Sequence, residues 1–270
     1  MRNVKKVLSM TVVIVLVLSV MPIQAFASDD DSSRSAAGTA SIYKPGDGVN
    51  EGFTLLTEEQ IKEEAALAAE AEAYLKAKEA DSTRATWNTV FIGDYKQTTG
   101  YNCGPAAARN VIQGYYKYVA YSNGTPLVTA PSESTLGGST YLNTSSSSGT
   151  DFNATRWQKT LNDYCSTISY KLAWGTSNWN SDMRTRVIYS IDSGGNRAVV
   201  ANLYHNSANS SQYVNSAYSG GIAHYISIYG YDDSSGIYYI VDSNTATSTY
   251  YQAAYYNAAW STQARGIVYC

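Results

Sequence analysis

Short runs in which apolar and polar residues alternate follow one another through the second half of the chain, and this period of two is typical of β-strands. The runs are rich in Tyr, Ile and Val and are separated by turn residues such as "DDSSG". We expect them to be antiparallel strands. They cover residues 198–204, 223–231, 237–243 and 264–270.

Apolar residues at helical spacing precede these strands and predict three helices. The first is an alanine-rich run from Cys103 to about Val119, and the others are "DFNATRWQKTLNDYC" and "SDMRTRVIYSIDSG". Residues 121–150, rich in Ser, Thr and Gly, are expected to be loop or irregular β-structure, and "TVFIG" at residues 89–93 to be a strand. Helices followed by antiparallel strands predict one α+β domain over residues 86–270.

Residues 57–80 are expected to form a separate helix ahead of this domain. Thr57 and Gln60 have the spacing of a capping box, acidic residues fill the first turn, and Lys76 and Lys78 lie in the last turn. The bulky apolar residues are few, so the helix needs a surface to lie on. Two interpretations stay open: a solvated spacer, or a pro-segment that shields the functional site until it is cut off at the exposed stretch "DSTRAT".

The first 27 residues have the organisation of a secretory signal peptide. Basic residues precede an apolar run from Val7 to Val20, and small residues lead to an expected cleavage after Ala27. The run is shorter than the roughly 20 residues of a membrane-spanning helix. We therefore expect a secreted, extracellular protein with no membrane domain in the mature chain. Residues 28–85 would be an acidic linker followed by the helix described above.

Charge divides the exported part of the chain. Residues 28–84 carry 13 acidic and 6 basic residues, whereas residues 85–270 carry 9 acidic and 10 basic ones. The second region therefore offers no basic patch to nucleic acid. The chain has 2 histidines and neither an HExxH nor a CxxC motif, which leaves little with which to build a metal site. No cofactor is implied.

Three cysteines are an odd number for an exported chain. Cys165 and Cys270 are the natural disulfide pair, which would leave Cys103 as a thiol. No spacing rule requires that pairing, and the alternative of three reduced cysteines stays open. A domain of this size does not need a disulfide for stability.

Cys103 begins the first predicted helix, in "QTTGYNCGPAAARN". Unpaired N–H groups and the positive end of the helix dipole stabilise a thiolate at such a position. Pro105 suits the first turn, where its missing N–H costs little, and Gly104 would leave room for a substrate carbonyl beside the sulfur. The competing interpretation is a small core residue, because free cysteines are often buried.

His224 is the candidate general base for this thiol. Alternation places it on one strand face with Ile226 and Ile228, and an antiparallel return after the "DDSSG" turn leads to Asp242, whose carboxylate could hold the imidazole tautomer. Alternatively, His224 is only a hydrogen-bonded strand residue. His205, in the polar loop "YHNSANSSQY", is a second candidate for the base or for a substrate contact.

Gln97 lies six residues before Cys103. Its side-chain amide could stabilise the oxyanion of an acyl transfer together with the backbone N–H of Cys103. Considered alone, a glutamine in a loop is more simply a surface residue.

Gln97, "CGPAA" at a helix start, "HYISIYGYDD" and "YYIVDS" together resemble the C39-like branch of the papain-like cysteine peptidases, over roughly residues 90–245. The resemblance implies the papain-like cysteine peptidase fold, in which the helix bearing the nucleophile packs on an antiparallel β-sheet. Asn244 is a second candidate for the orienting residue, because other papain-like enzymes use an amide there. The implied roles are Gln97 as oxyanion donor, Cys103 as nucleophile, His224 as base and acid, and Asp242 as orienting residue.

Three functions are compatible with these features. The first is a secreted cysteine peptidase that hydrolyses a peptide or protein substrate through a Cys-His-Asp triad with a Gln oxyanion donor. The second is a papain-like amidase that applies the same chemistry to cell-wall amide bonds. The third is a non-catalytic extracellular binding module, in which some of the 25 Tyr and 5 Trp residues stack on sugars or on a partner.

Overall fold

The computed structural model describes residues 56–205, 213–218 and 222–270. The predicted signal peptide and all but the last residue of the predicted linker lie outside the described residues. Among the helices described, none is both long and apolar enough to cross a bilayer.

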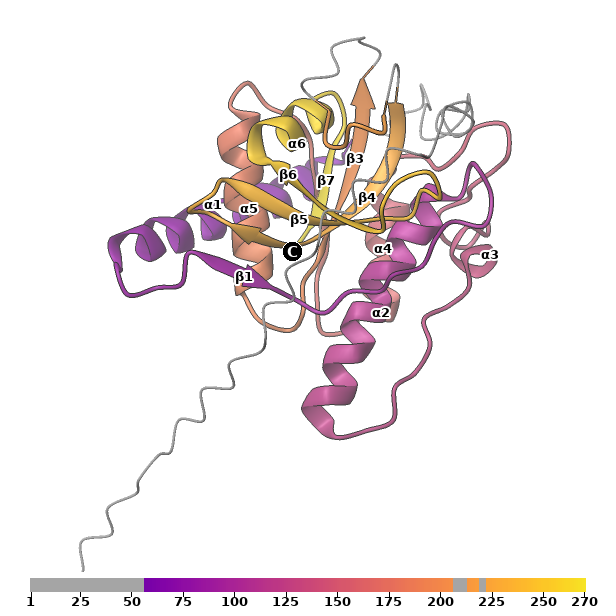
Figure 1. Cartoon of the computed structure of the whole chain (residues 1–270), viewed down its shortest axis with the longest axis horizontal. Coiled ribbons are helices and arrows are strands. Elements are labelled where there is room, and N and C mark those ends of the chain that lie inside the picture. Colours follow the sequence, from indigo (N-terminus) through magenta and orange to yellow (C-terminus); the bar gives the residue numbers. More distant parts are fainter. Residues whose placement is uncertain (1–55, 206–212, 219–221) are drawn as a thin grey trace, which may run out of the picture. The chain divides into compact units, whose positions relative to one another are not determined.

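An antiparallel sheet lies at the centre of the described domain (Figure 1). Its strands are β1 (Trp87–Thr89), β2 (Lys171–Ala173), β3 (Val199–His205), β4 (Ile222–Asp232), β5 (Ile237–Asp242), β6 (Tyr250–Ala254) and β7 (Gly266–Tyr269). Their order is β2-β7-β3-β4-β5-β6, and β1 pairs with β4. The register sets Leu203 opposite His224 and Ile226 opposite Asp242.

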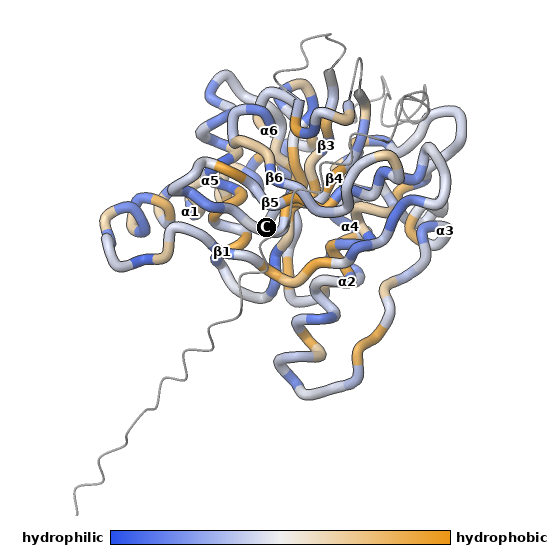
Figure 2. Tube along the Cα trace, viewed as in Figure 1, coloured by the Kyte–Doolittle hydropathy of each residue, from blue (hydrophilic) through white to orange (hydrophobic). Residues whose placement is uncertain are grey.

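Helices pack on both faces of this sheet. They are α1 (Glu58–Ala80), α2 (Cys103–Asn123), α3 (Glu133–Leu136), α4 (Ala154–Tyr164), α5 (Trp179–Asp192) and α6 (Tyr255–Thr262). The sheet separates two hydrophobic cores, and alternate residues of β3 belong to different ones. Val199 and Leu203 share one core with α5 and α6, whereas Val200 shares the other with α2 and α4. Figure 2 shows hydrophobic stretches in the central strands and mostly hydrophilic residues in the surrounding loops.

The predicted combination of helices with an antiparallel sheet is confirmed. The four predicted strands after residue 197 correspond to β3, β4, β5 and β7. Strands β2 and β6 and helices α3 and α6 were not predicted. Three of these elements, α3, β2 and β6, are five residues or fewer in length and too short to show a hydrophobic period. Strands β2 and β6 form by pairing with β7 and β5.

The predicted strand at residues 89–93 is wrong in its position. Strand β1 ends at Thr89, and the backbone that follows bonds to more than one element. The N–H of Val90 donates to a β4 carbonyl, but the N–H of Gly93 donates to the carbonyl of Asn110 in α2, both at 2.8 Å. An apolar segment whose hydrogen bonds go to several partners does not form a ladder.

Helix α2 carries Cys103 as its first residue and lies against β4. The Ser227 hydroxyl donates to the carbonyl of Ala107 at 3.2 Å, which ties the first turns of the helix to the strand. The helix continues past the predicted end near Val119 and stops at Gly124, which takes the left-handed conformation with φ 63°.

Helix α1 is confirmed together with its capping box. The Thr57 hydroxyl accepts from the N–H of Gln60 at 3.2 Å, and the Gln60 side chain accepts from the N–H of Thr57 at 3.0 Å. The helix packs on α5 and β2 and buries Ala71 and Leu75. Its role as a spacer or as a removable pro-segment stays a prediction.

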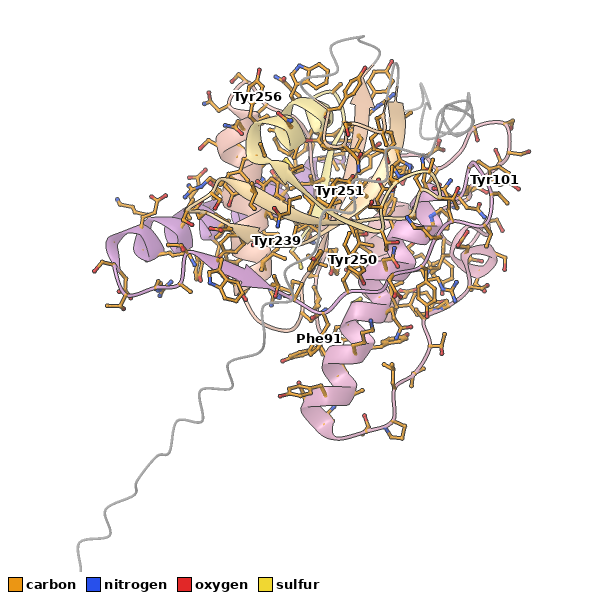
Figure 3. The ribbon with its side chains drawn as sticks, viewed as in Figure 1. Phe91, Tyr101, Tyr239, Tyr250, Tyr251 and Tyr256 are labelled. Carbon is orange, nitrogen blue, oxygen red and sulfur yellow. The ribbon has the colours of Figure 1, made fainter. Side chains whose placement is uncertain are left out.

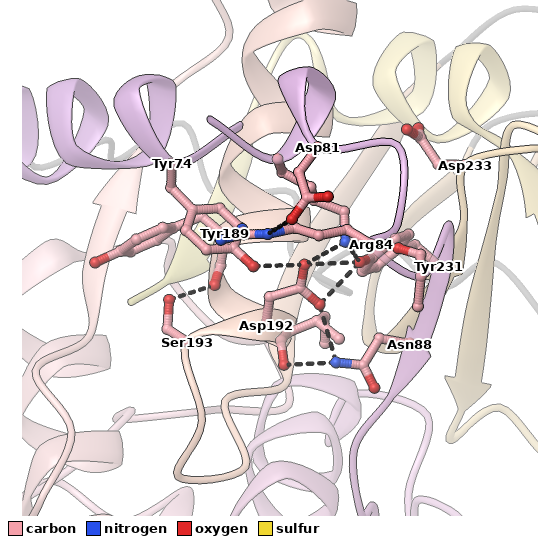
Figure 4. A network of polar contacts seen from close by, with 12 residues as sticks. Tyr74, Asp81, Arg84, Asn88, Tyr189, Asp192, Ser193, Tyr231 and Asp233 are labelled. Atoms are coloured by element: carbon pink, nitrogen blue, oxygen red, sulfur yellow. Dashed lines mark hydrogen bonds and ion pairs between the residues drawn. The ribbon is translucent and has the colours of Figure 1, made fainter. Parts of the chain in front are cut away.

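Asp192, at the end of α5, is a polar anchor of α1 (Figure 4). Its carboxylate accepts from Lys78 at 2.9 Å and from Tyr74 at 3.1 Å, both on α1. It also accepts from Tyr231 at 2.8 Å and Asn88 at 2.9 Å, which belong to the sheet. One buried carboxylate therefore joins α1, α5 and two strands.

Replacing Lys78 with Met is expected to lower the free energy of unfolding by about 2 kcal/mol, because a charged hydrogen bond to a buried carboxylate is lost. The Lys78 and Asp192 side chains are only 10% and 6% exposed. Lys159→Met is the matched control, since its pair with Asp163 is 46% and 40% exposed and should contribute little. Urea unfolding measures both. Equal effects of the two substitutions would contradict the role given to Asp192.

Candidate active site

A buried imidazole and a buried carboxylate meet at the end of the sheet where β4 begins and β5 ends. Asp242 is the last residue of β5 and lies opposite Ile226, so it shares a sheet face with His224, two residues earlier on β4. Nε2 of His224 is 2.8 Å from Oδ1 of Asp242, and the two side chains are 1% and 0% exposed. The antiparallel return expected from the sequence brings the two residues together.

This contact decides which imidazole nitrogen carries the proton. An ionised carboxylate only accepts hydrogen bonds, so Nε2 of His224 donates and Nδ1 keeps the lone pair of the neutral ring. Nδ1 is buried, and within the described ranges it has no hydrogen-bond partner. The ring therefore presents one buried basic nitrogen, as a general base requires.

Asp242 is ionised although it is buried. Burial acts to raise the pKa of this carboxyl. The charge that His224 carries when it is protonated, hydrogen bonds from His224 and Tyr218, and the backbone N–H of Asn244 at 2.8 Å together outweigh burial and hold the pKa below its ordinary value. The pair is thus a carboxylate beside an imidazole, the arrangement that stabilises an imidazolium.

Cys103 lies in the core beside this pair of strands. Its side chain is fully buried, in a cluster that includes Tyr225 and Val241. Tyr225 directly follows His224 in the chain, and Val241 directly precedes Asp242. Because successive strand residues point to opposite faces, Tyr225 and Val241 face this cluster from the positions directly beside His224 and Asp242.

The influence of the thiol extends to the imidazole side of the sheet as well. The Tyr218 hydroxyl donates to Asp242 on that side. Burial is the largest cause of the raised pKa of Tyr218, followed by Asp242 and Tyr251, and Cys103 adds to it. Burial and then Cys103 also raise the pKa of Tyr225, on the helix side. The thiol of Cys103 thus acts electrostatically on two tyrosines that flank His224 in the fold.

Gly104 packs against Thr150 and does not border an open space. A Cβ here would lie 2.5 Å from side-chain atoms of Thr150, so protein fills the space beside Gly104 that was expected to admit a substrate carbonyl. Thr150 is held by a hydroxyl contact of 2.7 Å with Thr144, and its carbonyl accepts from Tyr225 at 3.0 Å. The glycine lets the Ser-rich stretch pack on the start of α2.

Gln97 lies on the loop before α2 and is bonded to the residue after Asp242. Its N–H donates to the carbonyl of Ser243 at 2.8 Å, and its side-chain oxygen accepts from the Ser243 hydroxyl at 3.3 Å. Nε2 of Gln97 donates to the carbonyl of Thr99 at 2.8 Å. An amide nitrogen has two hydrogens, so this bond leaves the other one available for a further acceptor.

Lys96, whose role the sequence did not indicate, adds hydrogen bonds between the loop of Gln97 and the loop that follows β5. Its Nζ donates to the carbonyls of Asp242, Asn244 and Thr247 at 3.1, 2.7 and 2.9 Å. Burial lowers the pKa of Lys96, and the nearby charge of Asp242 opposes that shift. One ammonium group thereby holds the loop of Gln97 against the loop of Asp242.

The structure also bears on the two alternative site residues. The side chain of Asn244 accepts from the N–H of Ala246 at 2.9 Å, while its own N–H donates to Asp242, so its amide shapes the loop. His205 was expected in a polar loop, but its backbone belongs to a strand. It is the last residue of β3 and pairs with Ile222, because the β3–β4 ladder extends to that point.

All three cysteines are buried thiols, so the suggested pairing of Cys165 with Cys270 is not present. Burial raises the pKa of both thiols, to about 12 for Cys270. These two thiols stay protonated at neutral pH.

Two tyrosines complete the surroundings of the carboxylate and were not predicted. Tyr218 and Tyr251 both donate to Oδ2 of Asp242. The chain has 25 tyrosines, and no local pattern separates these two from the rest. Within the part of the chain that the structure describes, no group of three or more His, Cys, Asp or Glu residues is arranged to hold a metal ion.

Comparisons relate the chain to known proteins. The Peptidase_C39 like family matches residues 92–267, more than half of the chain. Among solved structures, the chain is similar to the crystal structure of a protein from Bacillus anthracis assigned as a C39-like peptidase, with 12% identity and a TM-score of 0.41. That similarity covers 67% of this chain and 97% of the other. A comparison with curated proteins finds no match.

Proposed function

Because the chain belongs to the Peptidase_C39 like family, we propose that it is a secreted cysteine peptidase whose nucleophile is Cys103. His224 acts as general base and acid, Asp242 orients it, and Gln97 donates to the oxyanion. The papain-like arrangement, with the nucleophile on a helix that packs on an antiparallel sheet, is part of this proposal. Export follows from the predicted signal peptide, and the mass of the mature protein recovered from culture medium tests it.

The buried pair of His224 and Asp242 is the observation that supports this proposal most strongly. A histidine that served only as a satisfied strand residue would have both ring nitrogens bonded. Here Nε2 is bonded to the carboxylate, while Nδ1 is buried without a partner among the described residues. A buried basic nitrogen without a partner is suited to removing a thiol proton, and this is the role that we propose for it toward Cys103.

In the first half of the reaction, Nδ1 of His224 takes the thiol proton and the sulfur of Cys103 attacks the peptide carbonyl carbon. The C–S bond forms, and the carbonyl oxygen becomes an oxyanion that Gln97 and the N–H of Cys103 stabilise. The imidazolium then gives its proton to the amide nitrogen, the C–N bond breaks, and the amine leaves.

In the second half, His224 removes a proton from water and the oxygen attacks the thioester carbonyl. The C–S bond breaks, the carboxylic acid leaves, and the thiol recovers its proton. The side chains of Cys103, His224 and Asp242 are buried. A substrate must therefore displace neighbouring side chains to reach the sulfur.

The test of this function is whether the purified protein cuts a mixed digest of denatured proteins, with new termini read by mass spectrometry. Defined new peptide termini support a peptidase. Release of fragments from purified cell wall, without new peptide termini from proteins, would instead support the amidase alternative.

Asp242→Asn is expected to reduce kcat/KM roughly a hundredfold, because the amide keeps the shape of the carboxylate but not the charge that stabilises the imidazolium. The variant should also lose an acid-dependent part of stability. A carboxyl whose pKa is lowered on folding stabilises the protein above the ordinary aspartate range, about pH 4, and this contribution is lost as the pH falls through the lowered value.

Urea unfolding from pH 6 down to pH 2 measures this difference. The wild type should lose more stability on acidification than Asp242→Asn does. Parallel pH curves for the two proteins would show that folding does not lower the pKa of Asp242.

A further inference from the structure

The carboxylate of Asp242 accepts more hydrogen bonds than the orientation of an imidazole requires. Oδ1 accepts from Nε2 of His224 and from the N–H of Asn244, both at 2.8 Å. Oδ2 accepts from the hydroxyls of Tyr218 and Tyr251, the second at 3.1 Å. Each oxygen thus uses both of its acceptor positions, in a residue with no exposed surface.

The two tyrosines reach Asp242 from different parts of the fold. Tyr218 lies in the segment 213–218 ahead of β4, and its ring centroid is 5.7 Å from that of His224. Tyr251 lies on β6, the strand that pairs with β5, and toward the middle of the domain in Figure 3. They converge on one oxygen only when the sheet is assembled.

An unbonded Oδ2 would be unfavourable at this position. Burial favours the neutral carboxyl, so ionisation of Asp242 depends on the groups that bind the charged form. Burial and then Asp242 raise the pKa of both Tyr218 and Tyr251, so their hydroxyls stay protonated and remain donors. Two donors on Oδ2 also hold the plane of the carboxylate and keep Oδ1 directed at the imidazole.

Other titratable groups face Asp242 from the surrounding elements. Lys96 binds its backbone carbonyl from the loop before α2, His224 faces it from β4, and Cys103 acts on Tyr218 from the start of α2. Among the described residues, only the two tyrosine hydroxyls bind Oδ2. Removal of these hydroxyls therefore takes both hydrogen bonds from Oδ2 and leaves the hydrogen bonds to Oδ1 in place.

We propose that Tyr218 and Tyr251 are positioning residues that hold Asp242 ionised and in plane, so that His224 keeps its proton on Nε2 and presents Nδ1 as the base. The inference rests on the proposed peptidase function and adds two residues that act through Asp242.

The test compares Tyr218→Phe, Tyr251→Phe and the double variant with Tyr238→Phe. Tyr238 is a matched control on β5, because its hydroxyl is buried and has no hydrogen-bond partner in the described residues. Each single variant should lower kcat for peptide hydrolysis about tenfold with little change in KM. The double variant should move the acid limb of the kcat/KM profile up by about one pH unit.

Nitrogen NMR of the imidazoles supplies a readout that needs no substrate. The chain has 2 histidines, so a His205→Gln variant assigns the signals. The Nε2–H signal of His224 should be shifted strongly by its hydrogen bond to the carboxylate, and on acidification this shift should be lost when Asp242 takes up a proton. In the double variant this loss should occur about one pH unit higher than in the wild type.

The inference would be overturned if the Nε2–H signal of His224 changed at the same pH in the wild type and the double variant. It would also be overturned if Tyr238→Phe moved that pH as far as the double variant does. If the wild type hydrolyses no peptide, the peptidase proposal fails on its own. The NMR comparison still decides whether the tyrosines hold the pair, because it depends only on the protonation of Asp242 and His224.

Discussion

Replacing Cys103 with Ala is expected to lower kcat/KM for peptide hydrolysis by at least about a thousandfold, because the sulfur is the atom that forms the acyl-enzyme. The substitution replaces a small, fully buried side chain with another and should leave the fold intact. Incubation of both proteins with a digest of denatured proteins, followed by mass spectrometry of the new termini, measures the effect.

Cys165→Ala is the matched control for this experiment. Cys165 is buried in the same core cluster, and burial raises the pKa of its thiol, so it should not contribute a nucleophile. This variant should cut the same bonds as the wild type. Identical products from wild type and Cys103→Ala would contradict the peptidase and favour the non-catalytic binding module.

Alkylation separates the same alternatives without a substrate. Iodoacetamide reacts with thiolates, so at pH 6 it should label Cys103 before Cys165 and Cys270, whose thiols burial keeps protonated. Equal labelling of all three would argue against an activated Cys103.

The second large effect is expected for His224→Gln, which should also lower kcat/KM by roughly a thousandfold. A glutamine can place an N–H near the position of Nε2 and so keep a donor for Asp242, but an amide cannot take the thiol proton. The residual rate should rise with pH, because hydroxide then forms the thiolate in place of the missing base.

His205→Gln is the corresponding control, since His205 is the second histidine that the sequence offered as a base. It should retain the wild-type rate and pH profile. If His205→Gln removes activity and His224→Gln does not, the assignment of the base is wrong. Circular dichroism and urea unfolding of both variants separate loss of chemistry from loss of fold.

The sequence located most elements because their signals are local. Thr57 and Gln60 indicated the start of α1 through a capping pattern that needs only three residues of spacing. The resemblance to C39-like peptidases also came from short motifs, and the family match at residues 92–267 confirms it. The strand at residues 89–93 was misplaced because apolar character does not show which element a backbone N–H reaches.

By itself, then, the sequence determined the family, the helices and strands with a clear period, and the residues able to perform thiol chemistry, since these depend on composition and short spacings. Only the tertiary structure decided that Asp242 binds Nε2 of His224, that Lys96 joins two loops, and that Tyr218 and Tyr251 converge on one oxygen. Strand register and chain packing set these contacts, and they join residues far apart in the chain, where no local pattern reaches.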